Sequence, residues 1–430
     1  MKKLYYKSDF SYNWKFNKKF SKENLSESYL ENEKKLKKDS KWPFFFPCNV
    51  CFILIKYKKN YYIEKIVGAA IVNRFPLILA LPISKKKISE RHLDKTDFIK
   101  KFLNSDNISI NLLNKKDLLN FKFKNHYLNQ IELSKKNIDF KNNIIKNSYL
   151  SIDVKKKELK QFTSINFNTH KLFFIPIKKF YVKKNLLKNE QILWKPLPII
   201  KKKIKFYFEI FLRKKYYKTF TNKYFYHFNK NNINYSKVIS LKKYFLVKLK
   251  NFSNLQISKL NNDEAKWPIF FPSSLGIIGS FDKKKKINFM PCGSTTVVNR
   301  YPFLFAVSIS HRKFNKRYDL RYSLKNILDK GVATIGVPFN NLSLIKFINY
   351  MGNTSKFSSP NKIINTKFNF KITKFGPILT EIPINFGCKV FKVIKFNTHK
   401  VIIFKVNKII YSKRFNNTEF KWSPTTTFIN

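Results

Sequence analysis

Short apolar runs alternate with polar turns along most of the chain. Runs that are rich in β-branched and aromatic residues and end at turns predict strands over Ser274–Phe281, Phe303–Ser310, Val332–Val337, Gly387–Lys395 and Lys400–Ile410. Ser323–Lys330 instead predicts a helix, because its apolar residues fall on one helical face and Gly331 follows them. Many strands with one helix between the third and fourth indicate a mainly β fold with some α, namely a small barrel rather than a doubly wound sheet.

The sequence contains an internal repeat. Four motifs recur in the same order at separations of 225 to 229 residues. The pairs are Lys41–Pro47 with Lys266–Pro272, Val67–Pro76 with Cys292–Pro302, Phe167–Lys171 with Phe396–Lys400, and Trp194–Pro196 with Trp422–Pro424. A constant order at a nearly constant spacing predicts a tandem duplication.

The repeat sets the expected domain organisation. Residues 1–40 are a charged N-terminal leader. The first repeat covers 41–199 and the second covers 265–425, and each is expected to form one barrel. Residues 200–264 join the two as a basic, aromatic connector, which we expect to be ordered rather than a flexible Gly/Ser tether.

The second repeat resembles the flavin reductase-like family, whose members are FMN-binding split barrels. The likeness covers most of 270–412 and rests on the order and spacing of short motifs. These are Leu275–Ser280, Gly293–Pro302, Val307–Ser310 (VSIS), Arg321–Ser323 (RYS), Gly331, Gly336–Pro338 (GVP), Gly352–Ser355, Gly387–Val393 and Asn397–Phe404. The resemblance implies two FMN-binding split β-barrel domains in tandem.

A site for FMN needs cations and hydroxyl donors for the phosphate, and backbone N–H groups near the flavin ring. The candidate cofactor-binding residues are Ser294, Thr295, Thr296, Ser308, Ser310, Arg312, Arg321 and Ser323. Ser323 is expected to cap the following helix, whose N-terminus favours phosphate. No side chain has to act as acid or base, so no catalytic residue is named. No metal site is expected either, because Cys48 and Cys51 have no second pair of ligands.

Each candidate also has a purely structural interpretation. Thr295 and Thr296 are compatible with ordinary strand positions, Ser323 with a helix cap alone, and Arg312 with a solvated loop charge. We interpret His399 as structural, because His170 occupies the same place in the first repeat.

The first repeat departs from the family pattern. Gly68-Ala69-Ala70 replaces the hydroxyl-bearing segment Ser294-Thr295-Thr296. The Ser-Ile-Ser sequence that ends the next strand becomes Pro82-Ile-Ser84. The Arg-x-Ser element has no clean match. We therefore expect a degenerate, mainly structural first repeat. Because family members pair as dimers with FMN near the interface, the resemblance implies an internal pseudo-dimer or a homodimer.

The net positive charge of the chain adds little to this functional interpretation. The formal net charge is +62, but only eight of the 87 basic residues are Arg. Abundant Lys, Asn, Ile, Phe and Tyr are typical of a genome biased toward A- and T-rich codons. Dedicated phosphate readers use Arg for its bidentate geometry. We therefore favour codon bias over a nucleic-acid partner as the explanation of the many lysines. The connector is the one stretch where the positive charge is still compatible with a partner.

Four cysteines and no apolar signal segment favour a cytoplasmic protein, although a basic leader is also compatible with import into an organelle. The longest apolar run, Phe75–Ile83, is too short to span a membrane. The leading hypothesis is an FMN-binding oxidoreductase similar to NAD(P)H:flavin reductases, with NAD(P)H as co-substrate. The alternative is a flavin-free duplicated barrel that acts as a basic binding or scaffold protein, on RNA for example.

Overall fold

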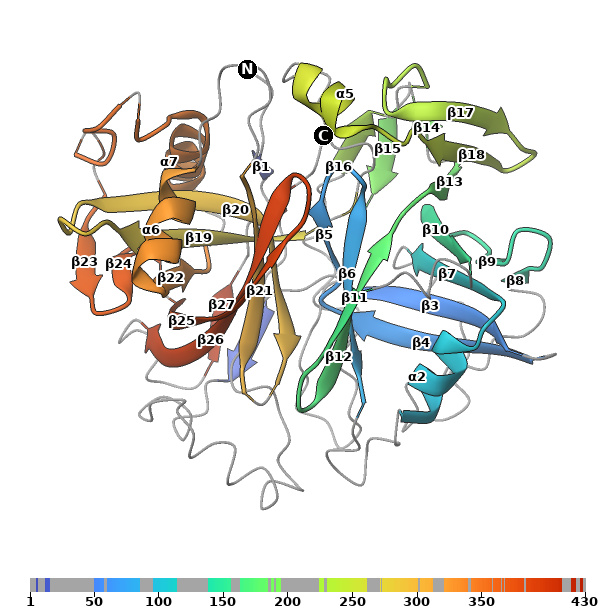
Figure 1. The fold of residues 1–430 in the computed structure, drawn as a ribbon, viewed down its shortest axis with the longest axis horizontal. Helices are drawn as coiled ribbons and strands as arrows, with labels where there is room; N and C mark the ends of the chain where they lie inside the picture. Colours follow the sequence, from blue (N-terminus) through green and yellow to red (C-terminus); the bar gives the residue numbers. More distant parts are fainter. Residues whose placement is uncertain are drawn as a thin grey trace.

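The computed structural model describes residues 5–6, 12–15, 50–57, 60–85, 96–113, 138–155, 163–184, 187–188, 191–194, 224–227, 230–260, 271, 273–300, 302–311, 321–338, 342–357, 359–364, 366, 368–382, 384–411, 419–422 and 426–427. The two repeats form two lobes that lie side by side, with the second repeat on the left of Figure 1 and the first on the right.

The second repeat is a closed barrel of six antiparallel strands. In order around the barrel they are β19 (Ser273–Phe281), β20 (Ile287–Asn299), β21 (Leu304–Ser310), β26 (His399–Tyr411), β25 (Ile384–Lys395) and β22 (Val332–Gly336). The barrel closes because β19 pairs with both β20 and β22. The five predicted strands all form, close to their expected bounds, so the prediction of a β-barrel is confirmed.

Two helices cover this barrel. Helix α6 (Tyr322–Lys330) ends at Gly331, whose φ of 68° is the left-handed conformation that glycine adopts without strain. Helix α7 (Leu342–Asn353) buries Leu344, Phe347 and Ile348 against apolar side chains of β19 and β20. A short hairpin, β23 (Phe370–Thr373) and β24 (Gly376–Leu379), packs beside them.

The first repeat has the same strand neighbours, with three of its strands broken. Its elements are β3 (Val50–Tyr57), β4 (Asn60–Val67), β5 (Ala70–Asn73), β6 (Ile78–Ser84), α2 (Thr96–Leu103), β7 (Asn107–Leu112), β10 (Leu150–Lys155), β11 (Thr163–Asn166), β12 (His170–Pro176) and β13 (Lys179–Lys183). Strands β4 and β5 stand where the second repeat has β20, β10 and β11 where it has β25, and β12 and β13 where it has β26. Matching pairings in matching order support the tandem arrangement.

The described parts of the leader and the connector attach to these barrels. Strands β1 (Tyr5–Tyr6) and β2 (Tyr12–Lys15) pair with β28 (Thr426–Thr427) and β27 (Glu419–Trp422). From the connector, β17 (Tyr235–Ser240) and β18 (Tyr244–Leu249) extend the first repeat's sheet through β13, and α5 (Asn254–Lys259) follows. The remaining short strands are β8 (Ile138–Asp139), β9 (Ile144–Ile145), β14 (Leu187–Lys188), β15 (Gln191–Trp194) and β16 (Tyr224–His227). No helix among the described residues combines the length and apolar character that a membrane crossing requires.

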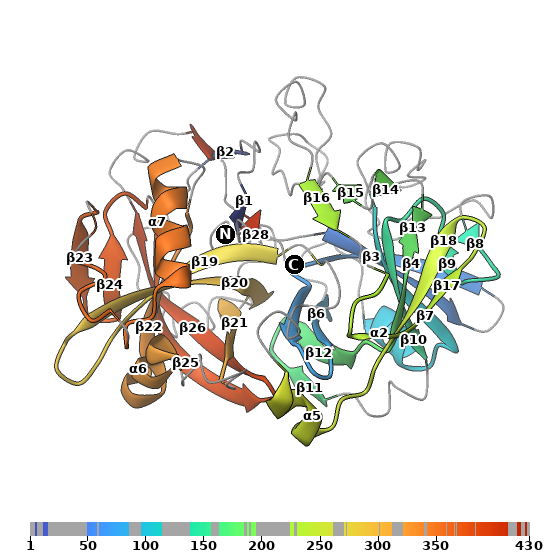
Figure 2. The same ribbon diagram turned by 90° about the horizontal axis from the view of Figure 1, so that it is seen from above.

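The two lobes share an apolar core whose members are related by the repeat. Val72, Ile78, Ala80, Leu172 and Phe174 of the first repeat pack in one buried cluster with their counterparts Val298, Leu304, Ala306, Val401 and Ile403. Aromatic contacts cross the interface as well, with the ring centroids of Phe174 and Phe396 5.1 Å apart. Figure 2 shows β6 and β12 facing the second barrel across this junction. Because each lobe covers an apolar strip of the other, the lobes depend on each other for burial.

Two buried asparagines join the lobes reciprocally. The Asn73 Oδ1 atom accepts hydrogen bonds from Thr398 N (3.0 Å), Thr398 Oγ1 (2.7 Å) and His399 N (3.2 Å). The Asn299 Oδ1 atom accepts from Thr169 N (3.1 Å), Thr169 Oγ1 (2.7 Å) and His170 N (3.1 Å).

The side-chain nitrogen of each asparagine stabilises the turn that follows it in the chain. Asn73 Nδ2 donates to Pro76 O at 2.7 Å, and Asn299 Nδ2 donates to Pro302 O at 2.8 Å. The recurring Asn-Arg-aromatic-Pro and Asn-Thr-His-Lys motifs are therefore the two halves of one contact, which is made twice. We call this pair of contacts the asparagine clasp.

Replacing either clasp asparagine with alanine removes the acceptor of three buried donors. We expect Asn73→Ala and Asn299→Ala each to lower the free energy of unfolding by about 2–4 kcal/mol, since each buried donor left without a partner costs roughly 1–3 kcal/mol and the site relaxes in part. Denaturant titration measures the loss. The matched control is Asn361→Ala, at an exposed asparagine of the second repeat. A loss no larger than that of the control would contradict the clasp's role.

Candidate functional site

The hydroxyl segment predicted from the sequence lies on β20, where it faces the first repeat. Thr295 and Thr296 are almost fully buried. The Thr296 hydroxyl donates to Gly68 O of the first repeat at 2.7 Å, and the Thr295 hydroxyl donates to Cys292 O at 3.0 Å. On the neighbouring strand β21, the buried Ser308 hydroxyl donates to Val72 O at 2.5 Å. Two predicted cofactor residues therefore also tie the lobes together.

These ties run in one direction only. In the repeat's register, Ala70 corresponds to Thr296 and Pro82 to Ser308. Neither side chain has a donor, so the first repeat cannot return the two hydrogen bonds. The loss of hydroxyls that marks the first repeat as degenerate thus makes the interface asymmetric at this point.

Gly68 lies in close contact with strand β20 of the second repeat. A Cβ atom at Gly68 would lie 2.6 Å from Val297 O and 3.0 Å from Thr296 Oγ1, and the residue's φ of 91° is strained for any other side chain. This kink separates β4 from β5, whereas β20 runs on without a break. Glycine is required here because the second repeat's strand needs the space.

The start of α6 brings together Arg321, Ser323 and a residue that the sequence did not single out. The N-cap is Arg321, which makes no side-chain cap hydrogen bond. The expectation that Ser323 caps the helix is therefore wrong, because the helix begins one residue before it. Instead, the buried Ser323 hydroxyl accepts a hydrogen bond from Asn288 Nδ2 at 2.7 Å. The Asn288 Oδ1 atom is buried and has no hydrogen-bond partner among the described residues.

A cluster of cations lies against the same helix end. Lys362 is 3% exposed, and its Nζ atom donates to Thr354 O at 2.9 Å. Burial, together with the positive charges of Lys356 and Arg321, lowers the pKa of Lys362 to about 8. The rings of Tyr322 and Phe357, whose centroids are 5.3 Å apart, hold this loop against α6. Arg321 at the N-cap of α6 and two lysines of the loop after α7 are therefore near enough to one another to lower the pKa of Lys362, and the backbone N–H groups of the first turn of α6 attract anions.

Cys292 connects the helix end to the strands. Its thiol donates to Ser308 O at 3.1 Å. Burial raises the pKa of this thiol, and the positive charge of Arg321 opposes part of that rise. Arg321 is therefore near enough to Cys292 to affect the pKa of its thiol, and Cys292 is hydrogen-bonded to the hydroxyl-bearing strand β21.

The first repeat reaches this region through Arg74. Its backbone N donates to Thr398 Oγ1 at 3.1 Å, next to His399. Burial lowers the pKa of His399 well below its usual value, and the charges of Arg74, His311 and Arg321 lower it further. The same Thr398 hydroxyl lies 2.7 Å from His399 Nδ1. His399 is therefore a buried, neutral member of the clasp.

The remaining candidates divide as follows. Ser294 is buried on β20, and the Ser310 hydroxyl donates weakly to Thr398 O at 3.4 Å. Arg312 lies outside the described residues. Sequence reasoning missed Asn288 and Lys362. Nothing in the sequence distinguishes Lys362 from the many solvated lysines, since its burial depends on the loop after α7.

Removing the Thr296 hydroxyl tests what this side chain does. We expect Thr296→Val to lower the free energy of unfolding of the flavin-free protein by about 1–2 kcal/mol, because the buried Gly68 carbonyl loses its donor. Denaturant titration without added flavin checks this. Ser310→Ala, which removes a weaker and less buried hydroxyl, is the matched comparison. Unchanged stability in Thr296→Val would mean that the inter-lobe hydrogen bond contributes nothing.

Comparison with known proteins assigns the second repeat. Residues 270–421 match the family model of the flavin reductase like domain. No curated protein matches the chain. Among solved structures, flavoredoxin from Methanosarcina acetivorans is 19% identical over 33% of this chain and 70% of its own (TM-score 0.28). Nitrilotriacetate monooxygenase component B from Bacillus cereus is 18% identical over 34% and 72% (TM-score 0.29). An FMN-binding protein from Thermus thermophilus is 18% identical over 33% and 71% (TM-score 0.28). By the family match, residues 270–421 are a flavin reductase-like domain.

Proposed function

We propose that the second repeat binds FMN and that the protein is an oxidoreductase, with a nicotinamide dinucleotide as hydride donor. The observation that carries the proposal is the convergence of Arg321, Lys356 and Lys362 at the start of α6, inside the flavin reductase-like domain. A phosphate dianion is the part of FMN that needs such a cluster.

The donor set of this region fits the cofactor. The α6 N-terminus has no side-chain cap, so the N–H groups of its first turn are available to phosphate oxygens. The buried Asn288 Oδ1 atom would accept a hydrogen bond from a hydroxyl of the ribityl chain, which would satisfy an acceptor that lacks a partner among the described residues. The segment from Ser294 to Thr296 would lie along the ring. When bound, FMN would supply the group that accepts hydride.

The role of the protein in this scheme is binding and positioning. Arg321 and Lys362 would fix the phosphate end, while β20 would hold the ring near the inter-lobe interface. The first repeat would complete the site by supporting β20 and β21 through Gly68 and Val72. In this proposal the chain forms an internal pseudo-dimer with one flavin site, because the first repeat has no clean counterpart of the Arg321–Ser323 element.

Flavin binding by the purified full chain tests the proposal. We expect the protein to bind FMN more tightly than riboflavin, because riboflavin has no phosphate for the cluster. Arg321→Gln combined with Lys362→Gln should weaken FMN binding at least tenfold and leave riboflavin binding unchanged. Lys330→Gln, at the exposed far end of the same helix, is the matched control. Titration calorimetry gives the affinities, and anaerobic bleaching of the bound flavin by NADH or NADPH tests the hydride donor.

Two outcomes would contradict the proposal. Equal affinities for FMN and riboflavin would remove the phosphate role of the cluster. A colourless protein that takes up no flavin but binds RNA with a steep salt dependence would favour the alternative of a basic binding protein.

The affinity for FMN should also depend on pH. Lys362, whose pKa is about 8, is mainly protonated at pH 7 and mainly neutral at pH 9. FMN phosphate is a dianion throughout this range. Binding therefore weakens as pH rises through about 8, by at most tenfold per pH unit, because a neutral lysine no longer attracts the dianion. Calorimetry at several pH values measures this slope. Riboflavin and the Lys362→Gln variant should lack it, and a slope retained in that variant would assign the titration to another group.

A further inference from the structure

A cavity lies outside the flavin reductase-like domain, between the first repeat and the connector. Its volume is about 360 Å³. Three segments line it, namely the turn between β5 and β6, the joint between β12 and β13, and the chain on either side of the β17–β18 hairpin. Ligand pockets in proteins span roughly 300–1,000 Å³, so this one suits a small metabolite.

Backbone hydrogen bonds hold the three segments together. Ile177 N donates to Leu77 O at 2.8 Å, which joins the first two segments. Leu249 N donates to Lys178 O at 2.8 Å, and Lys250 N donates to Asn234 O at 2.9 Å. The backbone segments that line the cavity are therefore fixed relative to one another by the fold.

The floor of the cavity is apolar and partly aromatic. Phe75, Leu77 and Ile177 are buried beneath it. The Phe75 ring lies edge-on to Phe252, with their centroids 5.2 Å apart. Behind Phe75, residues of α5 and its C-terminal cap pack against the same ring. A flat, uncharged ring would find an apolar surface here.

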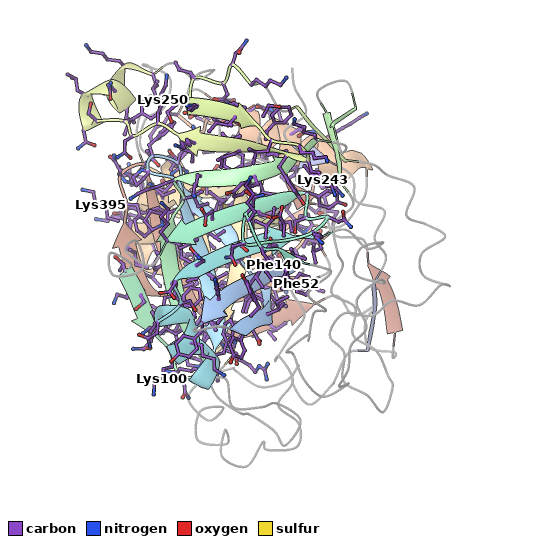
Figure 3. The ribbon with its side chains drawn as sticks, turned by 90° about the vertical axis from the view of Figure 1, so that its right-hand side faces the viewer. Phe52, Lys100, Phe140, Lys243, Lys250 and Lys395 are labelled. Carbon is purple, nitrogen blue, oxygen red and sulfur yellow. The ribbon has the colours of Figure 1, made fainter. Side chains whose placement is uncertain are left out.

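The rim carries only positive formal charge. Arg74 is half-buried, Lys178 and Lys250 are exposed, and no lining residue is acidic. Figure 3 shows Lys250 beside the β17–β18 hairpin, on the side toward α5. Residues 210–262 contain no Asp or Glu, so the connector adds no negative charge near this rim in the sequence. An anionic group is the partner that such a rim selects.

We propose that this cavity binds a nucleoside monophosphate. The base would lie against Phe252, which the buried Phe75 ring supports, and the phosphate would lie between Arg74, Lys178 and Lys250. The volume accommodates one base and one ribose phosphate rather than a dinucleotide. This site belongs to the first repeat and the connector, and it does not require that the second repeat binds flavin.

Titration of the full chain with AMP tests this proposal, with adenosine and inorganic phosphate as the separate halves of the ligand. We expect saturable AMP binding at one site, at least tenfold tighter than either half. The double variant Lys178→Gln/Lys250→Gln should weaken AMP binding at least tenfold and leave adenosine binding unchanged.

The matched control is Lys237→Gln/Lys248→Gln. These two exposed lysines pair across the same hairpin, lie outside the cavity lining and remove the same charge. The control should bind AMP like the unmodified chain. Equal weakening in both double variants would show a general charge effect and overturn the proposal, as would the absence of saturable binding.

Arg321→Gln separates this site from the proposed flavin site. It should weaken FMN binding and leave AMP binding intact. The double variant Lys178→Gln/Lys250→Gln should weaken AMP binding and leave FMN binding intact. Loss of AMP binding in Arg321→Gln, with binding retained in Lys178→Gln/Lys250→Gln, would place the nucleotide at α6 and overturn the proposal.

Discussion

The asparagine clasp is the contact on which the architecture depends. The side-chain oxygen of each clasp asparagine accepts hydrogen bonds from two backbone N–H groups and one hydroxyl of the opposite lobe. One buried hairpin tip in each lobe therefore has its donors paired. A buried donor without a partner lowers the free energy of unfolding, so an interface that buries backbone N–H groups of hairpin tips needs such acceptors. The clasp also fixes the register of the shared apolar cluster, because each asparagine lies one residue after its valine, Val72 or Val298. With that register set, β20 and β21 face Gly68 and Val72.

The interface explains why the two repeats diverge where they do. The clasp residues are identical in both copies, because the same hydrogen bonds are made in both directions, and the shared core stays apolar in both although several of its residue types differ. The hydroxyls of Thr296 and Ser308 are used in one direction only, from the second repeat to carbonyls of the first. Alanine and proline at the corresponding places cost the first repeat little, since no donor is needed from them to complete the contact. The residues that mark the first repeat as degenerate in the sequence are therefore also the residues that make the interface asymmetric.

Much of the fold was predictable from the sequence. The barrel strands and the helix ending at Gly331 followed from local periodicity and glycine chemistry, and the repeat showed which motifs belong together. The meaning of the Asn-Arg-aromatic-Pro and Asn-Thr-His-Lys motifs was not predictable, because it depends on contacts between residues more than 100 positions apart. Ser323 was misplaced because a serine before a helical run is a usual cap, while here α6 starts at Tyr322 with Arg321 as its cap. Lys362 gave no signal because its burial arises from a loop folded against α6.

The large positive charge takes on a different meaning in the structure. Most lysines contribute to solubility and to a general attraction for anions, which ionic strength screens. Charge becomes selective only where burial or a fixed backbone holds cations close together. That condition is met at α6, where Lys362 keeps a cation in a buried position at the cost of a lowered pKa. It is met again at the rim of the first repeat's cavity, where backbone hydrogen bonds hold the segments that bear Arg74, Lys178 and Lys250. Under both proposals, the positions of a few constrained cations, rather than the total of +62, would decide which anions this protein distinguishes.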